Sequence, residues 1–346
     1  MTTDVLLEWV IKTAIILFVL VTAVAYLTFL ERKVMSWIQL RIGPNRVGPW
    51  GLLQPLADGV KMIFKEDIIP TEANRWLYVA APAISLIPSL MTFIVIPYGG
   101  VVHVPFINRD VALRVTSMNI GLLYIFALTS LGVYGLVLAG WASNNKYSLM
   151  GGLRSSAQMI SYELALGISI VSVLLYTGTL DLSAIVGQQS GRFGLLGWNF
   201  FKPPLFLVFI VFYIASLAEC NRTPFDLPEA ESELVAGYHT EYSSMKFVMF
   251  QMAEYINLIT ASSIAVTLFF GGYIGPKVNF YPWLGLVYFA MKVLALIVLA
   301  MWIRFTLPRF RYDQLMRFGW KFLLPASIIN VIITATVVLL WPPHNP

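Results

Sequence analysis

Long runs of apolar residues alternate along the chain with segments that hold most of the charged residues. A helix needs about 20 mostly apolar residues to cross the hydrocarbon core of a bilayer. A window of about that width identifies eight candidates, centred on residues 16–30, 77–96, 120–140, 159–176, 205–217, 247–270, 284–303 and 324–340. The runs are too uniformly apolar for the alternating strands of a transmembrane β-barrel. The pattern predicts an all-α polytopic membrane protein with about eight transmembrane helices, in a single integral membrane domain over residues 1–346.

Composition narrows the class of protein further. Hydrophobic residues make up 58% of the chain and charged residues 12%, whereas an ordinary soluble domain carries about 25% charged residues. These values exclude a water-soluble globule, a disordered chain and a secreted disulfide scaffold. The one cysteine, Cys220, excludes an intrachain disulfide and a cysteine-ligated iron–sulfur cluster or zinc site. The three histidines have no metal-ligand spacing, so we expect no metal site.

The loops between the predicted helices differ in their content of Lys and Arg. Counted alternately, the odd-numbered loops hold sixteen of these residues and the even-numbered loops hold five. Basic residues accumulate in cytoplasmic loops, so the odd loops, near residues 31–75, 141–157, 222–246 and 304–323, are predicted to be cytoplasmic. Loops 1 and 5 are long and rich in apolar residues, and we expect them to be structured. Both termini then lie on the opposite side of the membrane.

The first loop mixes basic and apolar residues. Arg41 and its neighbours are interleaved with Trp37, Ile38 and Leu40, a pattern that suits an amphipathic helix lying in the membrane interface. One interpretation is a surface anchor for the first helix. The other is the mouth of a cavity where Arg and Trp face an amphipathic, aromatic ligand.

The fifth loop concentrates acidic residues. Six carboxylates lie between Glu219 and Glu241, among Leu, Phe, Ala, Val and Tyr side chains. The simple interpretation is a solvated acidic loop. The alternative is a partly buried cluster, in which neighbouring carboxylates have raised and coupled pKa values and can exchange protons near neutral pH.

Three ionisable residues fall inside the predicted spans: Glu163, Glu254 and Lys292. Each costs about 2.5–3.5 kcal/mol at the centre of a bilayer, so such residues normally face a polar interior and mark ion or proton paths. A structural salt bridge is the competing interpretation, with Lys292 as the expected partner of either glutamate.

Four long segments, in order along almost the whole chain, resemble one family. They contain QLRIGPNRVGP and GLLQPLADGVK, then SAQMISYEL, then AECNRTPFDLPEAESELVAGYHTEYS with FQMAEY, and finally WIRFTLPRFRYDQLM. Together they are similar to the quinone-site membrane subunit (the H subunit in bacteria) of respiratory complex I, the proton-pumping NADH:quinone oxidoreductase.

The resemblance implies a position at the heel of the membrane arm, where loops 1 and 5 help to wall a quinone chamber. The matching positions imply that the chamber is lined or bordered by Arg32, Trp37, Arg41, Asp58, Arg222 and Phe225. They also imply a charged path toward the proton-pumping subunits, formed by Asp58, Glu163, Glu219, Glu229, Glu231, Glu233 and Glu254. Lys292 joins this path as the remaining ionisable residue within a span.

The resemblance further implies a quinone as substrate, with ubiquinone expected, and no complete active site in this chain alone. NAD, FMN and the iron–sulfur clusters would belong to partner subunits of the peripheral and membrane arms, in agreement with the single cysteine. No nucleic-acid partner is expected. The expected location is the bacterial cytoplasmic (inner) membrane, with the mitochondrial inner membrane as the alternative.

Two other functions fit part of the pattern. Intramembrane Glu and Lys suit a free-standing proton or cation transporter equally well, and a passive scaffold that only docks partners is the third alternative. The sequence favours the complex subunit for two reasons. The long charged loops lie on one side of the membrane only, and they contain too many apolar residues to be simple connectors.

Overall fold

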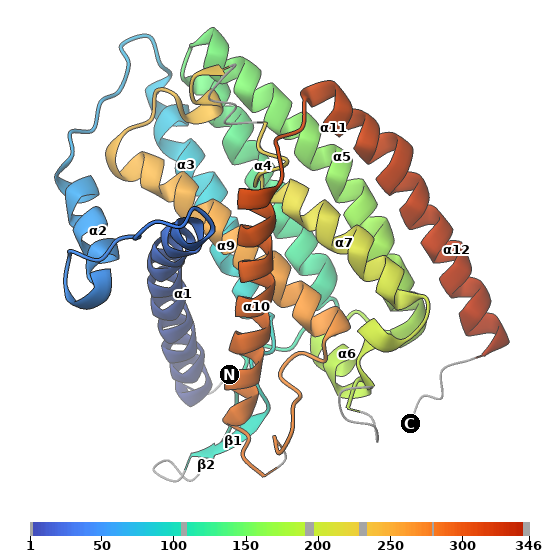
Figure 1. The fold of residues 1–346 in the computed structure, drawn as a ribbon. Coiled ribbons are helices and arrows are strands. Elements are labelled where there is room, and N and C mark those ends of the chain that lie inside the picture. The colour runs from blue at the N-terminus through green and yellow to red at the C-terminus, as the bar shows by residue number, and fades with distance from the viewer. Residues whose placement is uncertain (1–2, 105–108, 191–196, 228–233, 279, 342–346) are drawn as a thin grey trace.

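The computed structural model describes residues 3–104, 109–190, 197–227, 234–278 and 280–341. Helices stand side by side in a bundle, and the longer loops gather at one of its ends (Figure 1). The helices are α1 (Thr3–Ile38), α2 (Gln54–Phe64), α3 (Arg75–Met91), α4 (Gly121–Ala142), α5 (Lys146–Thr177), α6 (Leu182–Gln188), α7 (Leu205–Glu219), α9 (Ser244–Phe269), α10 (Leu284–Thr306), α11 (Tyr312–Phe318) and α12 (Leu324–Leu340). Short 3-10 segments are η1 (Pro49–Gly51), η2 (Thr92–Ile94), η4 (Asn199–Phe201) and η5 (Gly237–His239), and a π-helical turn, η6 (Gly319–Leu323), joins α11 to α12.

Among the described residues, seven helical segments are long and apolar enough to cross a membrane. They comprise α1, α3 with η2, α4, α5, α9, α10 and the continuous α11–α12 segment. The remaining predicted run forms α7, whose 15 residues extend about 22 Å, less than the roughly 30 Å of a hydrocarbon core. Pro203 and Pro204 directly precede α7, and proline cannot supply the N–H that an earlier start would need. The predicted all-α polytopic class is confirmed, with α7 shorter than a full span.

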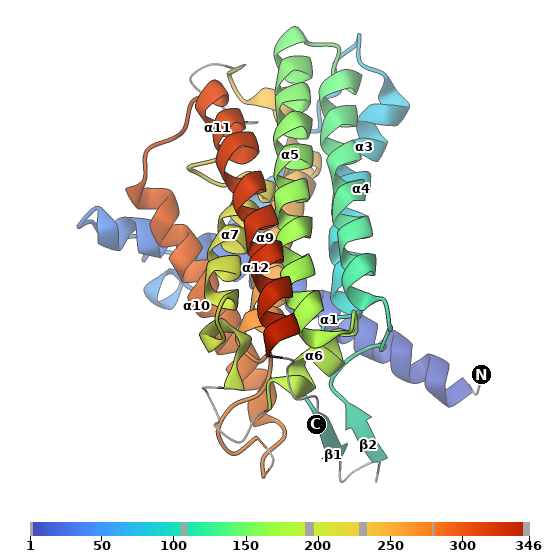
Figure 2. The same cartoon turned by 90° about the vertical axis from the view of Figure 1, so that its right-hand side faces the viewer.

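The first helix is longer than a membrane is thick. Its 36 residues extend about 54 Å, so α1 must tilt or project beyond the hydrocarbon. Figure 2 shows α1 strongly inclined to α5. The C-terminal turns of α1 therefore reach across the bundle toward α9 and α10, both of which it contacts.

The most buried span is α9, with 83% of its apolar window inside the bundle. It contacts α1, α3, α7 and α10. Two of its buried hydroxyls bond to its own backbone: Thr260 donates to the carbonyl of Ile256 at 2.9 Å, and Thr267 to that of Ile264 at 2.8 Å. Such bonds to the preceding turn satisfy polar side chains in a buried helix.

Close helix packing depends on glycine at two positions. A Cβ at Gly135 of α4 would lie 2.7 Å from the backbone nitrogen of Ser85 in α3, and one at Gly151 of α5 would lie 2.6 Å from that of Tyr238. Any larger residue would push the backbones apart. Gly151 thereby allows α5 to contact η5, which carries Tyr238.

The two ends of the bundle differ. At one end lies α11; at the other lie α6, the start of α1, the end of α12 and a short hairpin, while α2 stands at the side of the bundle next to α1 (Figure 1). The hairpin pairs β1 (Val101–Val104) with β2 (Arg109–Ala112) in antiparallel register, with Val101 opposite Ala112. The sequence pattern did not predict these strands, because each has only four residues.

The C-terminal end of α9 is closed by a lysine from α10. Lys292 Nζ donates to three backbone carbonyls, those of Phe270 at 2.8 Å, Gly272 at 2.9 Å and Ile274 at 2.7 Å. It also lies 4.4 Å from the centre of the Trp198 ring. Phe270 is the C-cap residue of α9, and Gly272 and Ile274 lie in the loop that follows, so the cation sits just beyond the helix end, where positive charge is favourable. Lys292 thus fixes the chain where it leaves α9.

Replacing Lys292 by Met should leave these carbonyls without their donor. Hydrogen bonds to charged groups each contribute about 1.5–3 kcal/mol, so we expect Lys292→Met to lower the free energy of unfolding by about 3 kcal/mol. Chemical unfolding of the purified protein in detergent measures this. The exposed Lys277 provides the control, and equal stability of Lys277→Met and Lys292→Met would contradict the capping role.

Candidate functional site

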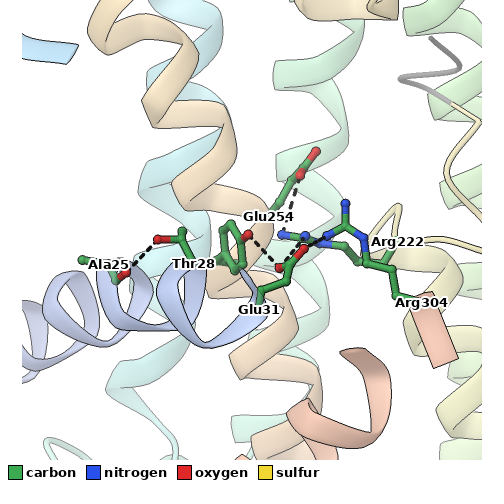
Figure 3. A network of polar contacts seen from close by, with 7 residues as sticks. Ala25, Thr28, Glu31, Arg222, Glu254 and Arg304 are labelled. Carbon is green, nitrogen blue, oxygen red and sulfur yellow. Dashed lines mark hydrogen bonds and ion pairs between the residues drawn. The ribbon is translucent and has the colours of Figure 1, made fainter. Parts of the chain in front are cut away.

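Six polar side chains from distant parts of the chain meet near the loop-rich end of the bundle. We refer to them as the ion network; its members are Glu31, Arg222, Tyr238, Glu254, Tyr255 and Arg304. They come from α1, the loop after α7, η5, α9 and α10. Figure 3 shows the Glu31 carboxylate pointing toward Arg222 and Arg304, with Glu254 on the other side of Arg222.

Glu31 collects three donors at the end of α1. Arg222 Nη1 lies 3.4 Å from Glu31 Oε2, Tyr255 donates its hydroxyl to the same oxygen at 2.7 Å, and Arg304 Nη1 pairs with Oε1. The Glu31 side chain is 12% exposed. A nearly buried carboxylate needs such charged and hydrogen-bonded partners to offset the loss of water.

Arg222 lies between the two glutamates. Its side chain is 7% exposed, its Nη2 is 3.9 Å from Glu254 Oε2, and its guanidinium stacks 4.1 Å from the centre of the Tyr255 ring. Burial by itself lowers the pKa of Arg222, and Tyr255 together with the Glu31 and Glu254 carboxylates raises it above its usual range. The guanidinium is therefore held in its charged form.

Glu254 completes the network from within α9. Tyr238 donates its hydroxyl to Glu254 Oε1 at 2.9 Å. Two carboxylates thus face two guanidinium groups, so the network is close to neutral only while both acids are ionised. Inside a bundle, where water screens little, a charge gained or lost at one member changes the proton affinity of the others.

A cavity of about 410 Å³ lies beside the last turns of α1. Three arginines, Arg32, Arg41 and Arg46, contribute to its wall, and the remaining lining residues are Met35, Ile42, Gly43, Pro44, Asn45 and Gln54. Its size falls in the range of small-molecule sites. Arg32 directly follows Glu31, so neighbouring residues of α1 serve the cavity and the ion network.

The charged residues around this cavity are themselves positioned by first-loop partners. Arg32 pairs with Asp58 at 2.7 Å, and Gln54 donates to the same carboxylate at 3.1 Å. Arg41 Nε donates to Gln39 Oε1 at 2.7 Å. Trp37 is 67% exposed and does not line the cavity. Arg32, Arg41 and Asp58, proposed from the sequence, thus gather at one place with Trp37 on the neighbouring surface.

Phe225 lies away from the arginine cavity, in an aromatic cluster. It is 4% exposed and stacks with Phe310 and Phe318 at ring-centre distances of 5.6 and 6.5 Å, with Tyr162 tilted against it at 5.8 Å. The next residue, Asp226, pairs with Arg309 at 2.8 Å. These contacts anchor loop 5 to the segment before α11, and Phe225 does not line the arginine cavity.

Glu163 and Glu219 form a second polar group between α4, α5 and α7. Glu163 accepts a hydrogen bond from Ser130, and Glu219 from Thr129. Glu219 also lines a cavity of about 20 Å³ together with Asn257 and Thr260 of α9. The Asn257 Oδ1 atom is buried and has no hydrogen-bond partner among the described residues. A cavity of this size has room for about one water.

The structure separates Lys292 from the acids. We expected it to pair with Glu163 or Glu254, and this is wrong, because its three donors go to the carbonyls after α9. Sixteen residues separate Glu254 from Phe270, about 24 Å along a helix. Glu229, Glu231 and Glu233 lie outside the described residues.

Loops 1 and 5 meet at the same end of the bundle, as the charge count predicts. The Ser243 hydroxyl accepts from the Ile68 amide at 3.0 Å, and Lys246 pairs with Asp67 at 2.8 Å. Glu241 also joins residues 70–72 in lining a cavity of about 730 Å³. The two loops are therefore joined by direct contacts.

Sequence reasoning missed four members of the ion network: Glu31, Tyr238, Tyr255 and Arg304. Glu31 and Arg304 were counted with the loops, because each stands at the end of an apolar run. The sequence did offer one indication of this pair: the two residues have opposite charges and stand at the ends of predicted spans on the same side of the membrane. Neither tyrosine carried a signal of its own, because hydroxyl partners depend on helix packing.

Comparison with known proteins gives a consistent assignment. A family model described as NADH dehydrogenase matches residues 11–335. One of the NADH-quinone oxidoreductase H subunits of Koribacter versatilis is 50% identical, with 97% of this chain and 98% of that protein covered. One of those of Geobacter sulfurreducens is 52% identical over 94% and 93%, and that of Protochlamydia amoebophila is 53% identical over 92% and 94%. The chain therefore belongs to the NADH dehydrogenase family, among the H subunits of NADH-quinone oxidoreductase.

Proposed function

We propose that this chain, as the membrane-embedded H subunit of an NADH-quinone oxidoreductase, helps to bind quinone and to couple quinone reduction to proton translocation. The names of its relatives support membership in the complex and do not favour a free-standing transporter. The observation that supports the coupling role is that the arginine cavity and the ion network adjoin each other. One turn of α1 supplies Arg32 to the arginine cavity and Glu31 to the buried ion network.

The arginine cavity is the proposed approach for the quinone headgroup. A quinone ring accepts hydrogen bonds through its two carbonyl oxygens, and guanidinium groups are strong charged donors. Arg41 and Arg32 are the proposed donors, with Asp58 holding Arg32. Trp37 offers an exposed ring on the neighbouring surface. Arg222 and Phe225 would border the chamber from behind, through the ion network and the loop 5 aromatic stack.

The ion network is the proposed link between redox chemistry and protons. Quinone reduction takes up two electrons and two protons, so it brings negative charge toward the arginines before protonation is complete. That charge would raise the proton affinity of Glu31 and Glu254 across Arg222. The Glu163–Glu219 group, with the small cavity at Asn257, would continue the path. Glu229, Glu231 and Glu233 remain part of this proposal, whereas Lys292 serves as a helix cap.

The surrounding assembly follows from this role. Partner subunits of the peripheral arm would supply the NADH site, FMN and iron–sulfur clusters, and neighbouring membrane subunits would receive the proton path. Ubiquinone is the proposed quinone. We also propose that the loop-rich end faces the cytoplasm of a bacterial inner membrane, with both termini on the opposite side.

Removing the Arg41 guanidinium should separate two activities of the complex. We expect Arg41→Ala to lower kcat/KM for quinone reduction about tenfold, because it deletes a charged hydrogen-bond donor. NADH oxidation by an artificial acceptor at the flavin should stay unchanged. Lys65→Ala, an exposed cation of the same loop, is the control. Equal loss of both activities in Arg41→Ala would indicate failed assembly and contradict a local role.

Removing the Glu254 charge should uncouple the complex without dismantling it. Glu254→Gln keeps an oxygen for Tyr238 but leaves Arg222 facing an uncharged amide. We expect proton pumping and coupled quinone reduction to fall about tenfold, within the usual range of coupling between linked sites. Glu66→Gln, at an exposed position, is the control. Full activity of Glu254→Gln in assembled complex would make Glu254 purely structural.

Orientation can be tested with the buried Cys220 left in place. We expect Lys61→Cys and Lys277→Cys, both at exposed positions, to react with a membrane-impermeant maleimide from opposite sides. In sealed inside-out vesicles only the Lys61→Cys variant should be labelled, because the cytoplasmic face is outward. Labelling of the Lys277→Cys variant alone would reverse the proposed orientation.

A further inference from the structure

The junction of α11 and α12 presents two neighbouring cations to the outside of the bundle. Arg317 in α11 and Lys321 in η6 are four residues apart and exposed. Neither forms an ion pair within the part of the chain that the structure describes. Asp313, one turn earlier, pairs with Arg311 at 2.8 Å. Asp313 also interacts electrostatically with Arg317, so its single carboxylate serves two arginines. One carboxylate beside three cations leaves this surface positive, and like charges four residues apart on a helix repel, so an external anion would stabilise it.

An apolar stripe continues from these cations along α12. Ile328, Ile329 and Ile332 are 42%, 55% and 58% exposed, at helical spacing from Lys321. Trp320 lies beside Lys321; its ring is half exposed, and its Nε1 donates to Ser161 Oγ at 3.2 Å, which fixes the ring against α5. Figure 2 shows α11 and α12 on the outside of the bundle, in front of α5.

We propose that this surface, made of Arg317, Trp320, Lys321, Ile328 and Ile332, binds one anionic phospholipid. Arg317 and Lys321 would hold the phosphodiester, and the isoleucines would contact an acyl chain. Trp320 would lie beside the headgroup, at the membrane interface where tryptophan is enriched in membrane proteins. This inference goes beyond the quinone and proton roles, and no redox residue contributes to it.

The order of the side chains matches the order of chemical groups in a lipid. The two cations, with Trp320 between them, come first, and the branched aliphatic side chains follow up to residue 332. This stretch extends about 22 Å along a helix, about the depth of one leaflet with its headgroups. A soluble anion would need only the cations. The continuous apolar stripe favours a ligand whose charge and chain are joined.

The test uses the assembled complex in detergent, titrated with phosphatidylglycerol and monitored by native mass spectrometry. We expect Arg317→Gln/Lys321→Gln to weaken one lipid site about 30-fold, given the usual contribution of each basic residue near anionic lipid. Lys65→Gln/Lys146→Gln removes two other exposed cations and should leave that site unchanged. The charge-conserving Arg317→Lys/Lys321→Arg should retain it.

Three results would overturn the proposal. Unchanged lipid binding in Arg317→Gln/Lys321→Gln is one, and equal weakening in the control pair, which would show a general charge effect, is another. Displacement of the lipid by inorganic phosphate or glycerol phosphate would show a headgroup-only anion site. Phosphatidylcholine, which carries no net charge, should not compete. Because neither residue lines the arginine cavity, failure here leaves the proposed quinone role intact, and quinone-reductase activity of each variant distinguishes the two.

Discussion

The fold of this chain depends on how it neutralises charge inside an apolar bundle. Glu31, Glu254, Arg222 and Arg304 are each expensive to place away from water by themselves, and together they offset one another's charge. Removing one partner of a buried pair typically costs about 3–5 kcal/mol, because the other charge is left uncompensated. The ends of α1 and α10 and the loop after α7 are therefore held against α9 by the same requirement.

This requirement also bears on the proposed link between the arginine cavity and the ion network. Residue 31 faces inward to the ion network and residue 32 faces outward to the arginine cavity. In the proposed coupling, a charge arriving in the cavity would act on groups that already offset one another. The contacts of Lys246 with Asp67 and of Ser243 with Ile68 hold the two long loops together, so the surroundings of the cavity remain fixed relative to α9.

Helix α9 is held in place at two points, once through an acidic side chain of its own and once through a basic side chain from α10. Near its N-terminal half, Glu254 joins the ion network; at its C-terminal end, Lys292 binds backbone carbonyls. The two ionisable residues are equivalent as intramembrane charges in the sequence, yet one belongs to a carboxylate network and the other to a helix cap. The aromatic stack of Phe225, Phe310 and Phe318 gives loop 5 a third anchor, which is purely apolar.

The sequence by itself determined the features that follow from local order along the chain. Apolar runs about as long as a bilayer is thick fixed the helical class, and the uneven distribution of Arg and Lys predicted that the loops near Arg41 and Arg222 share one end. Only the tertiary structure decided which charges meet. Pairing depends on the tilt of α1 and on which face of α9 and α10 turns inward, so Glu31, Tyr255 and Arg304 became partners across more than two hundred residues of sequence. For the same reason Lys292, which the sequence grouped with the glutamates, found its partners in the backbone at the far end of α9, because side-chain direction is set by helix packing and not by position along the chain.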